Sequence, residues 1–373
     1  MGKFVDQLNL QESLGGGEVY TRFLAKAFAD LGWSTRLFVN PRATFWPALL
    51  PQGAQIVKLG SMEQLDRAIS EKCSILLTHS ALDAQSAQRI ARRVRLVGIL
   101  HMPLYERFPE GLRHYHRLIP VSRHVADSAR SRGLEQISPV ELLGVADTHP
   151  RGKKAPIRKR SCYDWDRRKF RDRLMGWFAS CWPYASEGAP YERSAGALTL
   201  GIVSRLTPIK QFPLMFSFLA PIIARHAPLR LEIFGSGGYA SIRDLRRALQ
   251  PCASQVRFWG HQSDVGAVYR QLDYVLSGLP EKEALGLNLI EAQACGTPVL
   301  AVAAPPFTES VVDGQSGFLF EDPRKDGGAA FDALLEKLGG AGHRPDPREA
   351  VAHLHRFSEE AFRDRLERAL QGL

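Results

Sequence analysis

Two glutamates in the C-terminal half are spaced so that both can bind one charged, hydroxyl-rich ligand. Residues 280–304 read PEKEALGLNLIEAQACGTPVLAVAA, and seven residues separate Glu283 from Glu291. The pattern predicts a loop that ends at Gly286 and a helix that follows it, so that Glu283 lies on the loop and Glu291 one turn into the helix. Carboxylates in these positions can accept hydrogen bonds from the hydroxyls of a sugar or a ribose.

The start of this predicted helix is suited to an anion. The first N–H groups of a helix have no acceptor within the helix, and the helix dipole favours negative charge there. We therefore expect the N–H groups of Leu287, Asn288 and Leu289, next to Gly286, to hold a phosphate. Gly296-Thr297-Pro298 is typical of a helix end and is expected to stop this one.

Two cations follow a predicted strand in GIVSRLTPIKQFPLMF, residues 201–216. Arg205 and Lys210 are expected on the loop and first helical turn after that strand. Together they can neutralise a diphosphate. If the diphosphate is a leaving group, its charge grows in the transition state, and fixed cations then favour the reaction.

Three glycines, Gly15–Gly17, open the first long helical pattern. Without Cβ atoms, Gly16 and Gly17 let a ligand approach the backbone, with a helix N-terminus behind them. The run lacks the spacing of G-x-G-x-x-G, and Asn40 rather than an acidic residue follows the second predicted strand, so a dinucleotide site is poorly supported. The alternative interpretation is a flexible turn.

These candidate residues need a framework of strands and helices to hold them. Alternating apolar runs predict two α/β halves with parallel sheets. In the first half we expect strands near 3–8 and at 35–39, 55–59, 74–78, 94–100, 118–121 and 140–143, and helices at 18–31, 84–93 and 123–132. In the second half we expect strands at 198–203, 229–234, 256–259, 274–276, 299–302 and 318–320, and helices at 287–295, 327–338 and 359–370.

The predicted domains are 1–147, an interdomain segment at 148–197, and 198–373, with the last helix crossing back to the first domain as an alternative. The segment RGKKAPIRKR at 151–160 has six positive charges in ten residues, and no βα alternation is visible around it. Open α/β sheets bind ligands at the carboxyl ends of their strands. We therefore expect the candidate residues to gather at those ends.

Length and composition fit this picture. The chain has 373 residues, 45% of them hydrophobic and 24% charged, which excludes a collagen, a coiled coil and a mainly disordered chain. A net charge of +10 favours anionic partners without choosing among nucleotides, acidic lipids and nucleic acid.

The cysteines and the apolar runs indicate the compartment. Five cysteines without a C-x-x-C favour reduced thiols in a cytoplasm. The N-terminal residues lack the apolar core of a signal peptide, and no apolar run has the length of a membrane span. The expected location is cytoplasmic, with any membrane contact peripheral and on the inner face.

Taken together, these features resemble the retaining glycosyltransferases of family 4 (glycosyl transferases group 1), which have the GT-B fold. The resemblance rests on the E-x7-E pair Glu283 and Glu291 around Gly286, on CGTPV after it, and on the cation pair Arg205 and Lys210. It rests also on the N-terminal glycines, on His101 in GILHMP, and on the stretches VRFWGH, GVAD and TESVVDGQSGFL. It extends over nearly the whole chain except about 150–195. Leu285 and Pro305-Pro306 depart from the family's usual Phe and glycine pair.

The resemblance implies two Rossmann-like domains facing each other across a cleft, and sugar transfer from a nucleotide diphosphate sugar with retention at the anomeric carbon. It implies that Glu291 holds the ribose and that Glu283, with nearby N–H groups, holds the donor sugar. Arg205 and Lys210 would hold the diphosphate. His101 would lie near the reacting sugar, and Gly16 and Gly17 near the phosphate or acceptor. No cofactor and no metal ion are implied.

The acceptor, by the same resemblance, is a glycan or a lipid-linked molecule, as in cell-surface polysaccharide or glycolipid synthesis. A basic segment with one apolar helical stripe bears on this: Phe170, Leu174, Trp177 and Phe178, flanked by arginines. A helix of this kind suits an anionic membrane surface. The alternative is a helix packed between the domains.

Two other functions remain as alternatives. One is a nucleotide-sugar epimerase of the same fold, which would turn over donor without acceptor. The other is a polyanion or nucleic-acid binder acting through the basic segment 151–182. Nucleic acid is disfavoured as a partner because it leaves Glu283 and Glu291 without a purpose.

Overall fold

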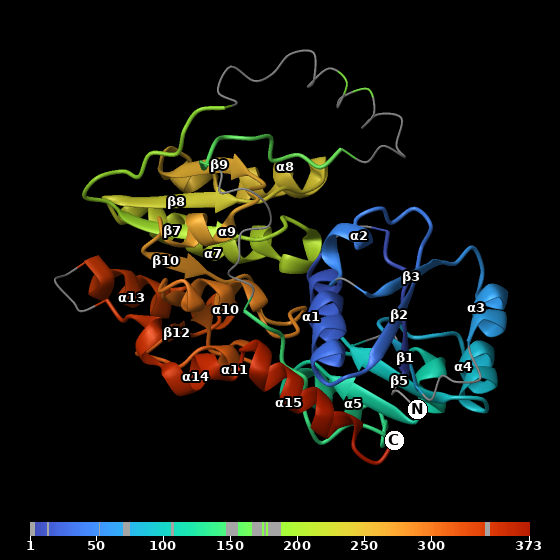
Figure 1. Cartoon of the computed structure of the whole chain (residues 1–373). Coiled ribbons are helices and arrows are strands. Elements are labelled where there is room, and N and C mark those ends of the chain that lie inside the picture. Colours follow the sequence, from blue (N-terminus) through green and yellow to red (C-terminus); the bar gives the residue numbers. More distant parts are fainter. Residues whose placement is uncertain are drawn as a thin grey trace. The chain divides into compact units, whose positions relative to one another are not determined.

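The computed structural model describes residues 4–12, 15–51, 53–69, 75–105, 108–146, 156–165, 174, 177, 188–339 and 344–373. The chain forms two compact units, and each is considered by itself. The first comprises Met1–Val145 together with His355–Leu373, and the second comprises Ala146–Leu354. Figure 1 shows the elements of both units.

The first unit alternates strands and helices along its N-terminal part and adds one helix from the end of the chain. Its elements are β1 (Phe4–Asn9), α1 (Gly16–Asp30), β2 (Ser34–Val39), α2 (Trp46–Leu49), β3 (Gln55–Lys58), α3 (Met62–Ala68), β4 (Ile75–Thr78), α4 (Ala84–Ala91), β5 (Arg95–Leu100), η1 (Glu110–His114), β6 (Arg117–Pro120), α5 (Arg123–Arg130) and α15 (Glu359–Leu370).

The second unit repeats the alternation. Its elements are β7 (Leu198–Val203), η2 (Pro208–Lys210), α7 (Phe212–Arg225), β8 (Leu229–Phe234), α8 (Tyr239–Ala248), η3 (Gln250–Gln255), β9 (Val256–Gly260), α9 (Val265–Tyr269), β10 (Tyr274–Leu276), α10 (Leu287–Ala294), β11 (Val299–Val302), α11 (Phe307–Ser310), β12 (Gly317–Phe320), α12 (Pro323–Asp326), α13 (Ala329–Gly339), η4 (Pro347–Glu349) and α14 (Val351–His355).

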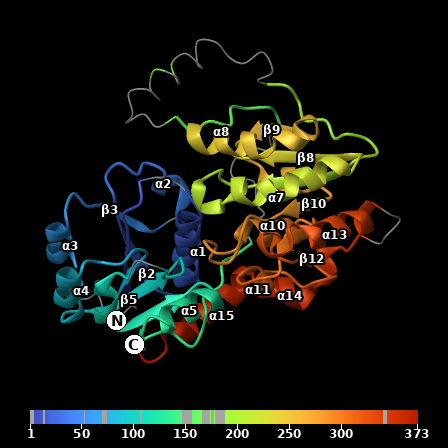
Figure 2. The same ribbon diagram turned by 180° about the vertical axis from the view of Figure 1, so that it is seen from behind.

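Each unit is built on one parallel sheet, which confirms the predicted α/β class. Within the described residues the strand orders are β3-β2-β1-β4-β5-β6 and β12-β11-β10-β7-β8-β9. In the second sheet β7 pairs with both β8 and β10, and all of the pairings are parallel. The carboxyl ends of these three strands therefore lie at one edge, and the loops that leave them are neighbours. Figure 1 shows β8, β7 and β10 in this order, and Figure 2 shows the same sheet from behind, with β8, β9 and β10 labelled.

The sequence-based boundaries were close where apolar runs are bounded by turn residues. The strands predicted at 198–203, 229–234, 274–276 and 299–302 have those bounds in the structure, as does the helix predicted at 359–370. Apart from Leu198, the apolar side chains of these strands are buried, and strands covered on both faces are rich in such residues.

The strand predicted at 140–143 is wrong. Val140 lies in a bend, and the stretch belongs to neither sheet. The N–H of Leu142 donates to the carbonyl of Pro120 at 2.8 Å. The N–H of Val140 donates instead to the nearby Oγ of Ser138 at 3.1 Å. The run is apolar because Leu142 and Leu143 are buried, not because it pairs with a strand along its length.

The last helix, α15, packs on the first unit, so the final residues belong with the N-terminal sheet rather than with the second unit. The rings of Tyr20 on α1 and Phe362 on α15 meet edge to face, with centroids 5.3 Å apart. Arg117 donates to the carbonyls of Ala369 at 2.8 Å and Gln371 at 2.7 Å. These contacts fasten both ends of α15.

Among the described residues, no helix combines the length and the apolar character that crossing a bilayer requires.

Candidate functional site

An ion pair between Lys210 and Glu283 stands at the carboxyl edge of the second sheet. Lys210 closes η2 after β7, and Glu283 lies on the loop after β10. Their side chains are 22% and 12% exposed, and the Nζ of Lys210 donates to an Oε of Glu283. A carboxylate with this little exposure needs a counter-charge, and Lys210 supplies it. The structure thus brings together two of the residues that the sequence selected.

Gly278 makes this approach possible. A Cβ at position 278 would lie 2.7 Å from the carbonyl oxygen of Lys210, closer than such atoms come. Only glycine therefore lets the loop after β10 pass so near η2. The N–H of Glu283 donates to the carbonyl of Pro280 at 3.0 Å, and this turn directs the loop toward the helix that follows.

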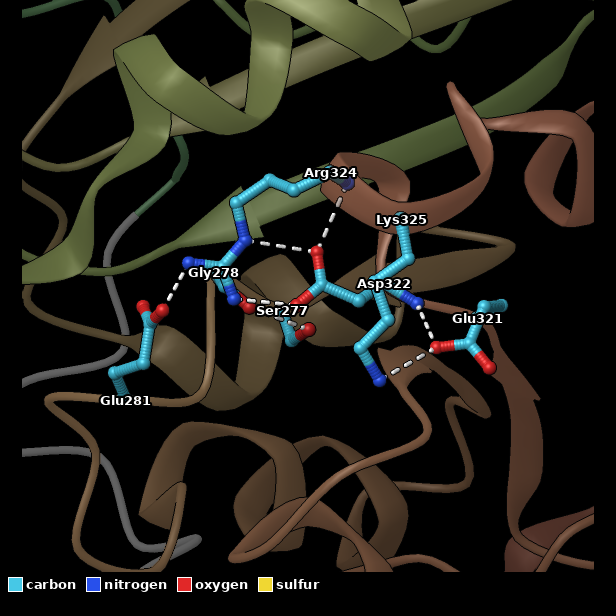
Figure 3. A network of polar contacts seen from close by, with 7 residues as sticks. All are labelled: Ser277, Gly278, Glu281, Glu321, Asp322, Arg324 and Lys325. Atoms are coloured by element: carbon cyan, nitrogen blue, oxygen red, sulfur yellow. Dashed lines mark hydrogen bonds and ion pairs between the residues drawn. The ribbon is translucent and has the colours of Figure 1, made fainter.

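A second set of charges holds the loop that carries Glu283 (Figure 3). Arg324, on α12, forms an ion pair with Glu281 and a bidentate ion pair with Asp322. In the second pair the Nε of Arg324 donates to the Oδ1 of Asp322 at 2.9 Å. The hydrogen bonds from Arg324 hold the pKa of Asp322 below its ordinary value. The segment after β12 is thereby joined to the segment after β10, two residues before Glu283.

Gly286 sets the direction of α10. Its φ of +77° is the left-handed conformation, and a Cβ there would meet the ring of Phe307 at 3.2 Å. The side-chain amide of Asn288 donates to the carbonyl of Val203 at 3.2 Å, which fixes the start of α10 beside the end of β7. The N–H groups of Leu287 and Asn288 are in the first turn, where a helix offers no acceptor.

The structure differs from the expectation at Leu289. Its N–H donates to the carbonyl of Gly286 at 2.9 Å, because the left-handed Gly286 tightens the first turn into a three-residue hydrogen bond. This N–H is therefore not free. At the other end of α10, Gly296 has φ +81° and Thr297 donates to Ala292 at 2.9 Å, the predicted glycine end.

Glu291, in the second turn of α10, is half-buried and has a partner that sequence reasoning missed. The hydroxyl of Tyr269 donates to an Oε of Glu291 at 3.0 Å. Tyr269 closes α9 and is itself buried. Nothing in the spacing of the two residues in the sequence indicates this contact, since α9 and α10 are separated by a strand and a loop.

Arg205 is exposed on the loop after β7, beside a second glycine-rich loop. Residues 235–238 read Gly-Ser-Gly-Gly and follow β8 directly. A Cβ at Gly235 would lie 1.8 Å from the carbonyl of Ser204, and one at Gly237 would lie 2.1 Å from that of Leu206. Sequence reasoning missed this loop, although glycines that directly follow a strand were a usable signal.

In the first unit, His101 follows β5 and pairs with a histidine that was not predicted. The Nε2 of His101 and the Nδ1 of His79 lie 3.0 Å apart, with the rings stacked at 5.2 Å between centroids. Thr21 and Gln7 each approach the ring of His79 to 3.4 Å. Burial lowers the pKa of His101 to about 4, and burial with the neighbouring His101 lowers that of His79 well below its ordinary value. Both rings are therefore neutral at pH 7.

Gly16 and Gly17 form the first turn of α1, after Gly15 at its N-cap. A Cβ at either position would meet nothing within 4 Å among the described atoms. Neither position therefore requires glycine for packing against the described residues.

The segment expected to contact a membrane is described at two of its four residues. Leu174 is 45% exposed and Trp177 is 60% exposed. Phe170 and Phe178 lie outside the described residues. Among the described residues there is no group of three or more His, Cys, Asp or Glu side chains placed to hold a metal ion.

The comparison with known families gives a match in the second unit. Residues 197–337 match the family described as "Glycosyl transferases group 1". This range includes both glutamates, both cations, the glycine-rich loop after β8 and the whole of α10.

Curated relatives agree with this match over part of their length. The D-inositol 3-phosphate glycosyltransferase of Segniliparus rotundus is 31% identical over 197 residues, 48% of this chain and 42% of that protein. The protein of the same name from Stackebrandtia nassauensis is 37% identical over 155 residues, 37% of this chain and 34% of that protein. The match thus spans less than half the length of either relative.

Solved structures resemble the whole chain. Anabaena Alr3699/HepE in complex with UDP has a TM-score of 0.72 at 17% identity, with 100% of both chains covered. Sucrose-phosphate synthase from Thermosynechococcus elongatus has a TM-score of 0.70 at 16% identity, covering 98% of this chain and 97% of that one. At such identity the likeness shows the fold, which is GT-B. Residues 197–337 of this chain therefore match the glycosyl transferases group 1 family, within a chain that has the GT-B fold.

Proposed function

We propose that the protein transfers a hexose from a nucleotide diphosphate sugar to a glycan or lipid-linked acceptor, with retention at the anomeric carbon and without a metal ion. The observation that carries the proposal is the pair Lys210–Glu283 beside the start of α10, at the edge where β7 and β10 end. A cation, a carboxylate and unused helix N–H groups in one place suit a ligand that has both phosphates and hydroxyls.

The diphosphate of the donor would replace Glu283 as the partner of Lys210. Arg205, exposed and on the same loop, would bind the diphosphate together with Lys210 and the N–H groups of Leu287 and Asn288. Glu283, released from Lys210, would accept hydrogen bonds from the hydroxyls of the sugar. Glu291, oriented by Tyr269, would do the same for the ribose.

In the proposed reaction the bond between the anomeric carbon and the phosphate oxygen breaks, and an acceptor oxygen bonds to that carbon from the same face. The acceptor proton passes to the departing phosphate oxygen. The negative charge left on the diphosphate grows as the bond breaks, and Lys210 and Arg205 stabilise it. The neutral His101 and the open turn at Gly16 and Gly17 would contact the reacting sugar or the acceptor.

The site assignment predicts that Glu283→Gln and Arg205→Ala each lose at least about a hundredfold in sugar transfer, because each removes a charged contact to the donor. The assay is product formation from a panel of uridine and guanosine diphosphate sugars. Glu336→Gln on α13 and Arg243→Ala on α8, both at exposed positions, are the matched controls. Full transfer by a folded Glu283→Gln or Arg205→Ala protein would contradict the assignment.

The same assay separates the related activities. Conversion of a donor without any acceptor would indicate an epimerase. Loss of transfer after chelation, with recovery on adding magnesium or manganese, would contradict metal independence.

We further propose that the enzyme works in the cytoplasm at the inner face of a membrane, docked through Phe170, Leu174, Trp177 and Phe178. The high exposure of Leu174 and Trp177 supports this, since large apolar side chains in water are costly. The double variant Trp177→Glu with Phe178→Glu is expected to lose cosedimentation with vesicles that contain phosphatidylglycerol. Unchanged binding by the double variant would remove this proposal and leave the transferase proposal intact.

A further inference from the structure

A cavity of about 640 Å³ lies in the second unit at the edge strand β9. It is half open, and its walls are β9, the end of α8 with η3, and the segment 156–165. Four cations line it, together with aromatic rings: Lys159, Arg160, Arg246, Arg257, Tyr163, Phe258. It shares no lining residue with the candidate donor site, whose residues follow β7 and β10.

The charge in this cavity is of one sign. None of the described residues that line it is Asp or Glu. Arg257 is neutralised from outside by the buried Glu232, to which its Nε donates at 2.9 Å. For Lys159, Arg160 and Arg246, the part of the chain that the structure describes provides no ion-pair partner. Three cations without an ion-pair partner among the described residues therefore line one half-open cavity.

Arg246 is held in place by uncharged groups. Its guanidinium lies over the ring of Phe258 at 5.0 Å and over that of Tyr163 at 5.8 Å. Its Nη2 is 3.8 Å from the Sγ of Cys162. Contacts of this kind fix the direction of a guanidinium without cancelling its charge. A side chain that is oriented in advance loses less freedom when it binds an anion.

We propose that this cavity binds the phosphate group of an organic phosphate ester. A guanidinium forms paired hydrogen bonds with phosphate, and the two further cations can neutralise the second negative charge of the phosphate. The cavity has the volume of a small-molecule site, much more than one phosphate fills, and its remaining wall is aromatic and apolar. This favours a phosphate with an attached organic body. The ester is either a soluble compound or a lipid headgroup.

The first experiment measures the binding of glycerol 3-phosphate, a soluble probe, to the full chain by calorimetric titration at low salt. Arg246→Gln is expected to weaken binding by at least about tenfold, the loss typical of a charged hydrogen bond. Arg243→Gln is the matched control: it is on the same helix, exposed, and already paired with Asp244 at 2.8 Å. Lys210→Ala, in the candidate donor site, is expected to retain binding. This contrast separates the cavity from the donor site.

Should Arg246→Gln fail to fold, Lys159→Gln keeps the test open. The described hydrogen bonds of Lys159 are made by its backbone, to Ala189 and Gly188, and these survive the substitution. It is expected to weaken binding in the same direction.

The second experiment identifies the source of the phosphate. Vesicles of phosphatidylcholine with phosphatidylglycerol are compared with vesicles of phosphatidylcholine alone. A lipid headgroup is indicated if Arg246→Gln, but not Arg243→Gln, reduces cosedimentation with the anionic vesicles. A soluble ester is indicated if only glycerol 3-phosphate binding depends on Arg246.

Two results would overturn the proposal. Equal losses in Arg246→Gln and Arg243→Gln would show that net charge, not the cavity, binds the probe. Binding of a single-stranded oligonucleotide that depends on Arg246, with no binding of either phosphate ester, would assign the cavity to nucleic acid instead.

Discussion

The two stacked imidazoles of His79 and His101 illustrate how single residues here depend on their surroundings. Burial removes the water that would stabilise a charged ring, and the second ring adds repulsion once the first is protonated. Both side chains are therefore proton acceptors in the unfolded chain at mildly acidic pH but not in the folded one.

This pair predicts a specific pH dependence of stability. In the folded protein the pKa values of both rings lie below the ordinary 6.5, and that of His101 is about 4. The unfolded chain therefore binds protons at a higher pH than the folded one. The free energy of unfolding has its full contribution from these rings above about pH 7 and loses it as the pH falls from about 6.5 toward about 4. Each ring contributes a slope of at most ~1.4 kcal/mol per pH unit. Denaturant unfolding of His101→Gln across this range should show a shallower slope than the wild type.

The exposed His355 supplies the control for this measurement, because His355→Gln removes a histidine from the same unit without removing a buried one. Equal slopes in the wild type and in His101→Gln would show that this ring is not held neutral by the fold.

Among the elements, α10 shows most clearly how a local rule determines a site. Gly286 has to adopt a left-handed conformation, and only with it does the first turn direct its N–H groups to the edge where β7 ends. A β-carbon in that conformation costs about 1–2 kcal/mol. Here it would also press on Phe307.

We therefore predict that Gly286→Ala destabilises the protein by roughly 1–2 kcal/mol and weakens donor binding as well. Gly16→Ala is the informative counterpart, because its Cβ would enter open space in the first turn of a helix. It should leave stability nearly unchanged. Chemical denaturation with a thermal-shift titration of the donor measures both quantities, and equal destabilisation by the two variants would argue against the role given to Gly286.

The elements also show where prediction from sequence succeeded and where it stopped. Periodicity located β7, β8 and α15 to the residue, because each has a buried run with turn residues at its ends. Spacing selected Lys210 and Glu283, which the fold places in contact. Periodicity could not reveal the contacts of Tyr269 with Glu291 or of His79 with His101, because each pair depends on the packing of separate elements.

At the scale of the whole molecule, the first unit is discontinuous in sequence. Residues up to 145 and residues from 355 form it together, and Phe362 on α15 is buried in it. Phe362→Ala should cost about 3–5 kcal/mol. Since α15 packs on α1, hydrogen exchange should increase over residues 16–30 and remain unchanged over residues 212–225.

A core substitution in the second unit tests whether a loss of stability there leaves hydrogen exchange in the first unit unchanged. Leu335→Ala, on α13, removes a buried side chain from the second core and should accelerate exchange there without affecting residues 16–30. If Phe362→Ala accelerated exchange equally in both units, the two would not be separate folding units.

The discontinuity has a consequence for how the chain is made. A ribosome synthesises β1–β6 before the second unit, yet α15, which completes their unit, is synthesised after the second unit. The second unit can therefore reach its native structure during translation while the first unit still lacks α15. The unit that is started first is thus finished last, and in the interval the apolar side of α1 that α15 will cover is a surface for a chaperone to protect.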